Sequence, residues 1–413
     1  MISSPKCNKK PVETFRSTII LLKMNFKKFQ TGTLFQPKKG ATIKSMKSNP
    51  PLATILRNLA LAGFASSLLS VPALAGLATP VAVNTLTVPS STTAVLGTPY
   101  ARPVEAFGTV SSTSVTNSNT LLTVSVDLNG GSPALPAGTG NTDTSLSNTD
   151  ENVDGWWVVE ILDGPAIGLV LDVVGGTSNS ITVKGTLPSS INLSSGSKFA
   201  LRRAWTLASL LGTASTTNPF GYGSTPTATT VNGNVQILDS ASGSLTTYYI
   251  NKVGTGSANW RSSQTGTANK NHVPLGLGKG FIVVNLKTNP LTFTVSGDYR
   301  TARTRLIMAG GKKTLLANPG VYGTDFIASG IPTTSPNRAN SIPNAATDSY
   351  QVWSTSAKAF ALYRMGDATS SNGPTAFLGS TRTNPAISAF SSILVTPYGS
   401  NPAVITISPA LNP

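Results

Sequence analysis

The motif DENVDG contains the side chains best suited to binding a metal ion. Asp150, Asn152 and Asp154 offer oxygen ligands at alternate positions, and Gly155 permits a sharp turn, as in the first half of a calcium loop. The twelfth position, where a bidentate Glu belongs, is Ile161, and a strand-like WWVVEI follows in place of a helix. Two interpretations stay open, a weak calcium site and an acidic turn that leads into a strand, and the sequence favours the turn.

Catalytic motifs are sparse. His272 is the one histidine of the chain and lies in a polar loop, without the neighbouring acid and nucleophile that a catalytic triad needs. GLGKG at Gly276–Gly280 lacks the Ser or Thr of a phosphate-binding loop and precedes a strand-like FIVV, so it predicts a turn. The acidic residues are scattered singly. We therefore predict no enzymatic activity and no cofactor apart from the weak calcium candidate.

Four tryptophans are weak candidates for ligand binding. Trp156 and Trp157 are adjacent on a predicted strand and so point to opposite faces. Trp260 and Trp353 lie further along the chain. An exposed aromatic ring on a β scaffold can stack on a sugar, but ordinary core packing is the favoured interpretation for each of them.

The N-terminal part of the chain predicts a secretory signal. A basic segment from Met46 precedes the apolar run Leu59–Val71, which is too short to span a bilayer. Ala73 and Ala75 place small residues where a signal peptidase requires them, which predicts cleavage before Gly76. Met46 resembles the natural start of translation. A buried core helix is the alternative interpretation of this segment.

The predicted leader, residues 1–75, accounts for most of the charge. It contains twelve of the 31 basic residues and one of the 15 acidic residues, so the net charge of +16 falls to +5 beyond it. This removes the argument for a nucleic-acid partner. Cys7 is the one cysteine, so the mature chain has no disulfide and no cysteine for lipid attachment. No second long apolar run follows, and we expect an exported protein without an integral membrane segment, located outside the cell, on its surface or in the periplasm.

Short strand-like runs separated by turn residues predict an all-β fold. In LLTVSVDL, for example, apolar and polar residues alternate as in a half-buried strand. We expect a Thr/Pro/Ala-rich linker over 76–103 and a small β-barrel or sandwich over 104–205. Two tandem β-sandwich-like modules then follow over 206–300 and 301–413, with a short junction helix that Thr206 caps.

Three pairs of segments indicate that the two modules are duplicates. The pairs are NPFGYG at Asn218–Gly223 with NPGVYG at Asn318–Gly323, Val235–Ile237 with Tyr350–Val352, and NPLTFTVS at Asn289–Ser296 with NPAVITIS at Asn401–Ser408. Their offsets of about 100 to 115 residues drift slowly, as expected of copies with loop insertions. Chance matching of short Ser/Thr/Val-rich strings is the alternative.

The run from GWWVVEILDG to AWTLASLLG resembles an uncharacterised family of exported, β-rich bacterial proteins, and so do NVQILDSASGSLTTYYIN, GLGKGFIVVN and KKTLLANP. The resemblance covers roughly 105–410. It implies export and all-β modules, and it carries no assigned activity and no catalytic residues.

These features favour an exported structural or interaction protein of the cell envelope or extracellular space, with a role such as adhesion. Its expected partners are a surface polymer, a polysaccharide or copies of itself. A carbohydrate-binding protein that uses exposed aromatics is the alternative. An outer-membrane barrel and a hydrolase are less favoured, because the strands are short and the acids are dispersed.

Overall fold

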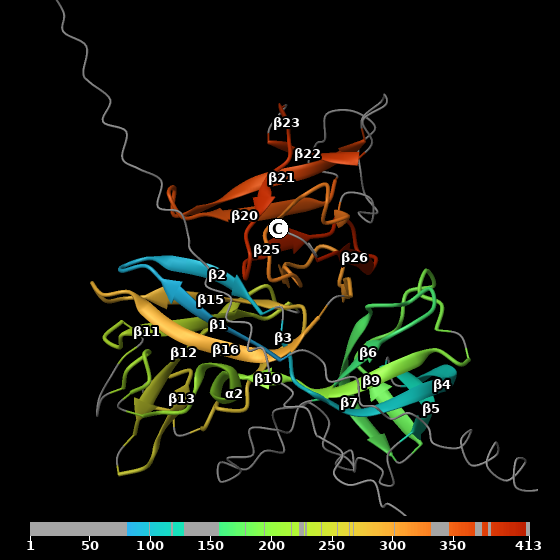
Figure 1. Ribbon diagram of the computed structural model, residues 1–413, viewed down its shortest axis with the longest axis horizontal. Helices are drawn as coiled ribbons and strands as arrows, with labels where there is room; N and C mark the ends of the chain where they lie inside the picture. The colour runs from blue at the N-terminus through green and yellow to red at the C-terminus, as the bar shows by residue number, and fades with distance from the viewer. Residues whose placement is uncertain are drawn as a thin grey trace, which may run out of the picture. The chain divides into compact units, whose positions relative to one another are not determined.

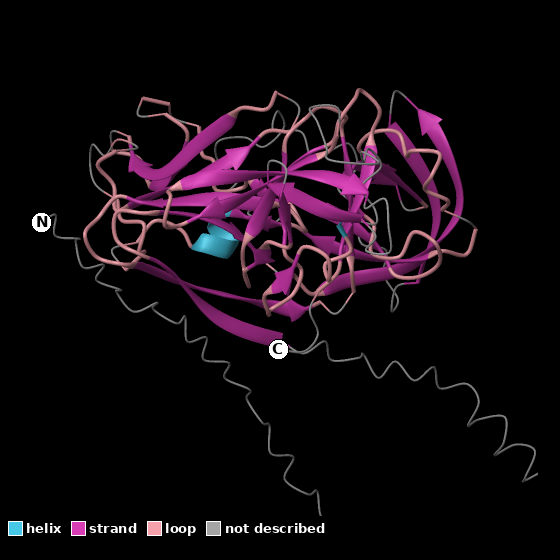
Figure 2. Ribbon diagram, turned by 90° about the horizontal axis from the view of Figure 1, so that it is seen from above, coloured by secondary structure: helices cyan, strands magenta, loops and turns pink. Residues whose placement is uncertain are grey.

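The computed structural model describes residues 81–409, except for 99, 117–118, 128–156, 178, 194, 216, 223–226, 228, 241, 254, 264, 267, 301, 332–346, 368–373 and 379–380. Nearly all regular structure in this part of the chain is β-strand, with one short helix, as Figure 2 shows. The predicted all-β class is confirmed.

Six strands form a closed barrel in the order β4-β5-β8-β7-β6-β9. They are β4 (Val104–Thr116), β5 (Asn119–Asp127), β6 (Trp157–Ile161), β7 (Val170–Thr177), β8 (Ser180–Val183) and β9 (Lys198–Arg203). Alternating residues such as Leu122 and Val124 are buried, while Thr123 between them is exposed. The sequence left a barrel and a sandwich open, and closure into a barrel pairs both edges of the sheet.

From Val81 onward, the segment predicted as a linker over 76–103 forms strands instead. β1 (Val81–Val88) pairs along its whole length with β16 (Leu291–Tyr299), and β2 (Thr93–Gly97) pairs with β15 (Gly280–Asn285). In Figure 1 the blue β1 and β2 lie beside the orange β15 and β16. A short β3 (Tyr100–Ala101) also joins β16. The Thr- and Pro-rich composition did not indicate these strands, because their pairing partners lie about 200 residues further along the chain.

A five-stranded sheet has the order β13-β12-β11-β15-β2. Its further strands are β11 (Gly233–Leu238), β12 (Leu245–Lys252) and β13 (Ala258–Arg261), while β10 (Trp205–Thr206) pairs separately with β14 (Pro274–Leu275). The predicted junction helix is α2 (Leu207–Leu211). The Thr206 hydroxyl accepts a hydrogen bond from the Ser209 amide, and Gly212 ends the helix.

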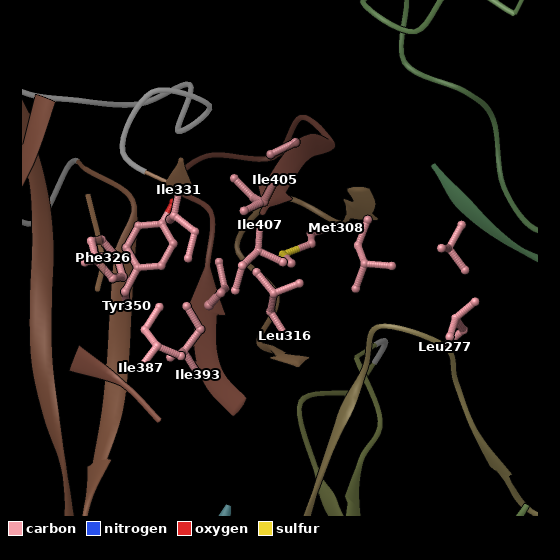
Figure 3. Close-up of a cluster of buried hydrophobic side chains, with 14 of the residues drawn as sticks. Leu277, Met308, Leu316, Phe326, Ile331, Tyr350, Ile387, Ile393, Ile405 and Ile407 are labelled. Atoms are coloured by element: carbon pink, nitrogen blue, oxygen red, sulfur yellow. The ribbon is translucent and has the colours of Figure 1, made fainter. Parts of the chain in front are cut away.

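A six-stranded sheet has the order β18-β25-β20-β21-β22-β23. Its strands are β18 (Thr314–Ala317), β20 (Ser349–Ser354), β21 (Ala359–Asp367), β22 (Pro374–Leu378), β23 (Thr381–Thr383) and β25 (Ser392–Thr396). Two pairs accompany it, β17 (Thr304–Met308) with β26 (Ala403–Ile407) and β19 (Thr324–Asp325) with β24 (Ala386–Ile387). In the core beside this sheet, Phe326 meets Tyr350 edge-on at 5.0 Å between ring centroids (Figure 3).

The two large sheets repeat one order of pairing. β11 lies between β12 and β15, as β20 lies between β21 and β25. The residue pairs of neighbouring strands also correspond. Val235↔Tyr248 matches Tyr350↔Tyr363, and Val235↔Val283 matches Tyr350↔Val395. Ile282↔Val95 matches Leu394↔Leu315, and Val88↔Leu291 matches Met308↔Ala403. The first set of strands therefore comprises β1 to β3 and β10 to β16, and the second comprises β17 to β26. The barrel strands β4 to β9 lie in the sequence between β3 and β10, within the first set.

One of the three sequence matches does not follow this correspondence. Asn218 lies after helix α2, whereas Asn318 follows strand β18. Both side-chain oxygens accept a hydrogen bond from the amide two residues on, at 2.9 Å in each case. The shared NP motif thus reflects a common local turn, at different points of the strand order.

The two large sheets contact each other through corresponding backbone groups. The Gly97 amide donates to the Phe390 carbonyl at 2.9 Å, and the Ala317 amide donates to the Gly278 carbonyl at 2.8 Å. A Cβ on Gly97 would lie 2.4 Å from the Ala317 Cβ, so only glycine allows this approach. The apolar residues Val95, Ile282, Leu315 and Leu394 form one buried cluster from β2, β15, β18 and β25.

Candidate functional site

Several predicted site residues lie outside the described residues. They are the calcium candidates Asp150, Asn152 and Asp154, the cleavage residues Ala73, Ala75 and Gly76, and Trp156. Among the residues that the structure describes, no group of three or more His, Cys, Asp or Glu side chains could hold a metal ion. Within the same residues, no helix is long and apolar enough to cross a membrane.

The described tryptophans serve the core. Trp157 is 3 % exposed, and the Arg203 guanidinium lies over its ring at 4.4 Å. Trp260 is fully buried and donates from Nε1 to the Gly212 carbonyl at 2.9 Å. Trp353 is partly buried and donates from Nε1 to the Thr93 carbonyl at 3.0 Å. The enclosed ring of Trp260 favours core packing for this residue. Trp157 is nearly as buried, but it lines one of the hollows described below.

A buried ion network joins the barrel to the strand set that contains β16. Glu160 of β6 accepts hydrogen bonds from Arg202 Nε at 3.1 Å and from Arg300 Nη2 at 2.6 Å. Arg202 also donates from Nη1 to Asp298 Oδ2 at 3.0 Å, and Arg300 donates from Nη1 to the Thr304 hydroxyl at 2.7 Å. All five side chains are nearly inaccessible to solvent. Sequence reasoning missed this network, because its members lie up to about 140 residues apart.

The network holds Glu160 in its charged form. Burial acts to raise the pKa of Glu160, but the charges of Arg300 and Arg202 and their hydrogen bonds outweigh burial, so the net direction is downward. Both carboxylate oxygens are engaged by guanidinium groups. A carboxylate held in this way neither donates nor takes a proton near neutral pH, so the arrangement is structural.

We expect this network to make stability fall in acid. The folded pKa of Glu160 lies below its unfolded value of about 4.3, so the carboxylate stabilises the fold above that pH and loses this contribution as the pH drops through the folded pKa. Urea midpoints measured from pH 7 to pH 3 should fall below about pH 4. The fall should be shallower in Glu160→Gln than in the natural chain. Parallel curves for the two proteins would contradict the assignment.

A cleft lies where the barrel meets both large sheets. It consists of two adjoining hollows of about 280 and 300 Å³. Five residues line both hollows: Asp172, Lys184, Ser240, Lys279 and Thr314. They come from β7, the residue after β8, the turn after β11, the residue before β15 and the start of β18. The cleft is thus assembled from segments that are distant in the sequence.

An ion pair occupies the cleft. Lys279 Nζ lies 2.7 Å from Asp172 Oδ2, and these side chains keep 38 % and 29 % of their surface exposed. Burial acts to raise the pKa of Asp172, but Lys279 and, more weakly, the charge of Lys184 lower it overall. Two ammonium groups therefore act on one carboxylate. Lys279 belongs to GLGKG, which forms the predicted turn before a strand, and nothing in its spacing indicated a site.

No protein-family model, curated protein or solved structure matches this chain. The resemblance of its central segments to exported β-rich proteins therefore stays an expectation.

Proposed function

We propose that this chain is an exported, non-enzymatic structural or interaction protein of the cell envelope or extracellular space. The observation that carries the proposal is the ion network of Glu160, Arg202, Arg300 and Asp298, which joins the barrel to the adjacent strands. Its partners would be a surface polymer, a polysaccharide or other copies of the chain. Such a protein presents surfaces and loops on a folded β framework, and it needs no reacting group.

The state of the acidic side chains supports binding over hydrolysis. A glycosidase needs two carboxyl groups across a cleft, one of them with a raised pKa. In the cleft, the pKa of Asp172 is lowered by Lys279, and Asp239 accepts hydrogen bonds from the amide and hydroxyl of Ser242. Asp172 is therefore not prepared to donate a proton at neutral pH, and the Asp239 carboxylate is engaged by Ser242.

The two strand sets are, in this proposal, copies of one unit. The support comes from the shared order of strands and from four sets of corresponding residue pairs. The first copy would then include β1 and β2 and would carry the barrel as an insertion. It would begin near Val81, well before the boundary at 206 that the sequence suggested.

The carbohydrate-binding alternative finds no support at Trp260, because its ring is enclosed by protein. Trp157 is 3 % exposed and lines one hollow of the cleft, where it offers little ring surface for stacking. Trp353 donates its N–H to the Thr93 carbonyl and packs edge-on against Phe360 at 5.1 Å. These contacts favour a packing role, so an aromatic platform is not proposed.

Export is tested by the intact mass of the chain in each cell fraction. We expect a species that begins at Gly76, outside the cytoplasm, because Ala73 and Ala75 satisfy the peptidase. Ala75→Phe should leave the uncleaved mass, while Ala78→Phe should not. A cytoplasmic species that keeps residues 1–75 would overturn the proposal, because the charge of +16 would then belong to the working protein and make nucleic acid the first partner to test.

A further inference from the structure

We propose that the cleft at Lys184 and Lys279 binds the carboxylate of a small organic ligand. The inference rests on the proposed interaction role and names the ligand class for one site. Each of the two adjoining hollows that make up the cleft, about 280 and 300 Å³, lies at the lower end of the volume range for small-molecule sites.

The cleft lies at a point where the two corresponding sheets differ. Leu238 of β11 pairs with Leu245, as Trp353 of β20 pairs with Phe360, so Leu238 and Trp353 occupy the same position in their sheets. The large indole of Trp353 reaches across to the Thr93 carbonyl of β2. Leu238 lines the cleft. Where one sheet places an indole, the other has a smaller side chain and an open hollow.

The corresponding positions also differ in polarity. Lys279 and Ser391 form matching isolated bridges, Lys279 with Leu316 and Ser391 with Leu96. The cleft therefore gains an ammonium group where the other half of the structure has a hydroxyl. At this place the cleft thus has a smaller apolar residue and a lysine where the other half has an indole and a serine, and both differences suit an anionic ligand.

The lysine side chains provide the place for a carboxylate. The charged residues of the lining are Lys184, Lys279, Asp172 and Asp239, so their formal charges cancel and the preference rests on where the two ammonium groups lie. Asp172 accepts a bond from Lys279, and the charge of Lys184 also lowers its pKa, so both ammonium groups act on this one carboxylate. Asp239 also lines the cleft, but its Oδ2 accepts from the Ser242 hydroxyl at 2.7 Å and from the Ser242 amide. A ligand carboxylate placed between the two lysines would form the charge-assisted hydrogen bonds that Asp172 leaves open.

The remaining walls define the rest of the ligand. Ser240 and Thr314 supply hydroxyl groups, while Leu238, Leu275 and Leu315 supply an apolar face. A compact ligand with one polar side and one apolar side fits this lining. Two sources have this chemistry, the uronic acid of an acidic polysaccharide and the terminal carboxylate of a peptide.

Calorimetric titration of the purified full chain distinguishes these sources. The probes are a hexuronate disaccharide, an N-acetylated dipeptide with a free carboxylate, and the amide form of each. We expect one acid to bind saturably and its amide to bind at least about tenfold more weakly, because hydrogen bonds to charged groups are the stronger ones. Absence of saturable binding for both acids would overturn the proposal and would leave export untouched, because export is read from the intact mass.

Variants test the residues. Lys184→Met and Lys279→Met should each weaken binding about tenfold or more, while Lys198→Met, on an exposed barrel position outside the cleft, should not change it. Asp172→Asn should strengthen binding, because it removes the competing carboxylate. Weaker binding in Asp172→Asn, or unchanged binding in Lys184→Met, would contradict the proposal.

Leu238→Trp tests the shape. It places in the cleft the residue that stands at the corresponding position of the other sheet, and it changes no charge, so we expect loss of binding with the urea midpoint preserved. If this variant fails to fold, Lys184→Met still tests the location of the site through its charge, because Lys184 is exposed and its replacement should not disturb the fold. Unchanged binding in a folded Leu238→Trp would show that the ligand lies elsewhere.

Discussion

Glu160→Gln is expected to lower the free energy of unfolding by about 3–5 kcal/mol, because it leaves two buried guanidinium groups without their carboxylate. Glutamine matches the size of glutamate, so the loss reports charge and hydrogen bonding more than packing. Arg202 would keep Asp298, while Arg300 would keep only the neutral Thr304 hydroxyl. Urea unfolding at pH 7 measures the difference.

Glu105→Gln is the matched control. Glu105 accepts from Arg203 Nε at 2.9 Å, but the side chains of Glu105 and Arg203 are 37 % and 28 % exposed. Partly exposed ion pairs contribute about 0–1 kcal/mol, so this variant should stay close to the natural chain. Equal losses in the two variants would refute the view that burial gives the network its effect.

Trp260→Ala should also cost about 3–5 kcal/mol of unfolding free energy. The indole is fully buried, meets Phe220 edge-on at 5.2 Å and donates its N–H to the Gly212 carbonyl. The substitution leaves a cavity and a carbonyl without that donor. Urea unfolding followed by far-ultraviolet circular dichroism measures the loss.

Phe107→Ala provides the comparison, because Phe107 is an aromatic residue of the barrel that is 51 % exposed. We expect it to change the unfolding free energy by no more than about 0.5 kcal/mol. If Trp260→Ala instead left stability unchanged and abolished binding of a saccharide, Trp260 would be a ligand residue, and the core assignment would be wrong.

Local features of the fold could be predicted from the sequence. The alternation around Leu122 and Val124 indicated a strand with one buried face, and Thr206 and Gly212 indicated the start and end of a short helix. Such features depend on neighbouring residues, whose spacing is visible in the chain itself. The all-β class follows from the sum of these signals.

Long-range pairing escaped prediction. The segment from Val81 to Gly97 was interpreted as a linker, although its strands complete sheets with Leu291–Tyr299 and Gly280–Asn285. Strand pairing depends on which sheet, formed by residues distant in the sequence, has an edge strand available, and the composition of a segment does not indicate that. The match between Asn218 and Asn318 was also no guide to the strand order. The two residues form the same local turn, but one follows helix α2 and the other follows strand β18.

The sequence by itself determined the all-β class and the junction helix, because each depends on spacing within a few residues. Only the tertiary structure decided which charges meet. Glu160 lies 140 positions from Arg300, and Asp172 lies 107 positions from Lys279, yet each pair is in contact. Coulomb attraction and desolvation depend on distances in space, and the sheets set those distances through backbone hydrogen bonds that carry no side-chain signature.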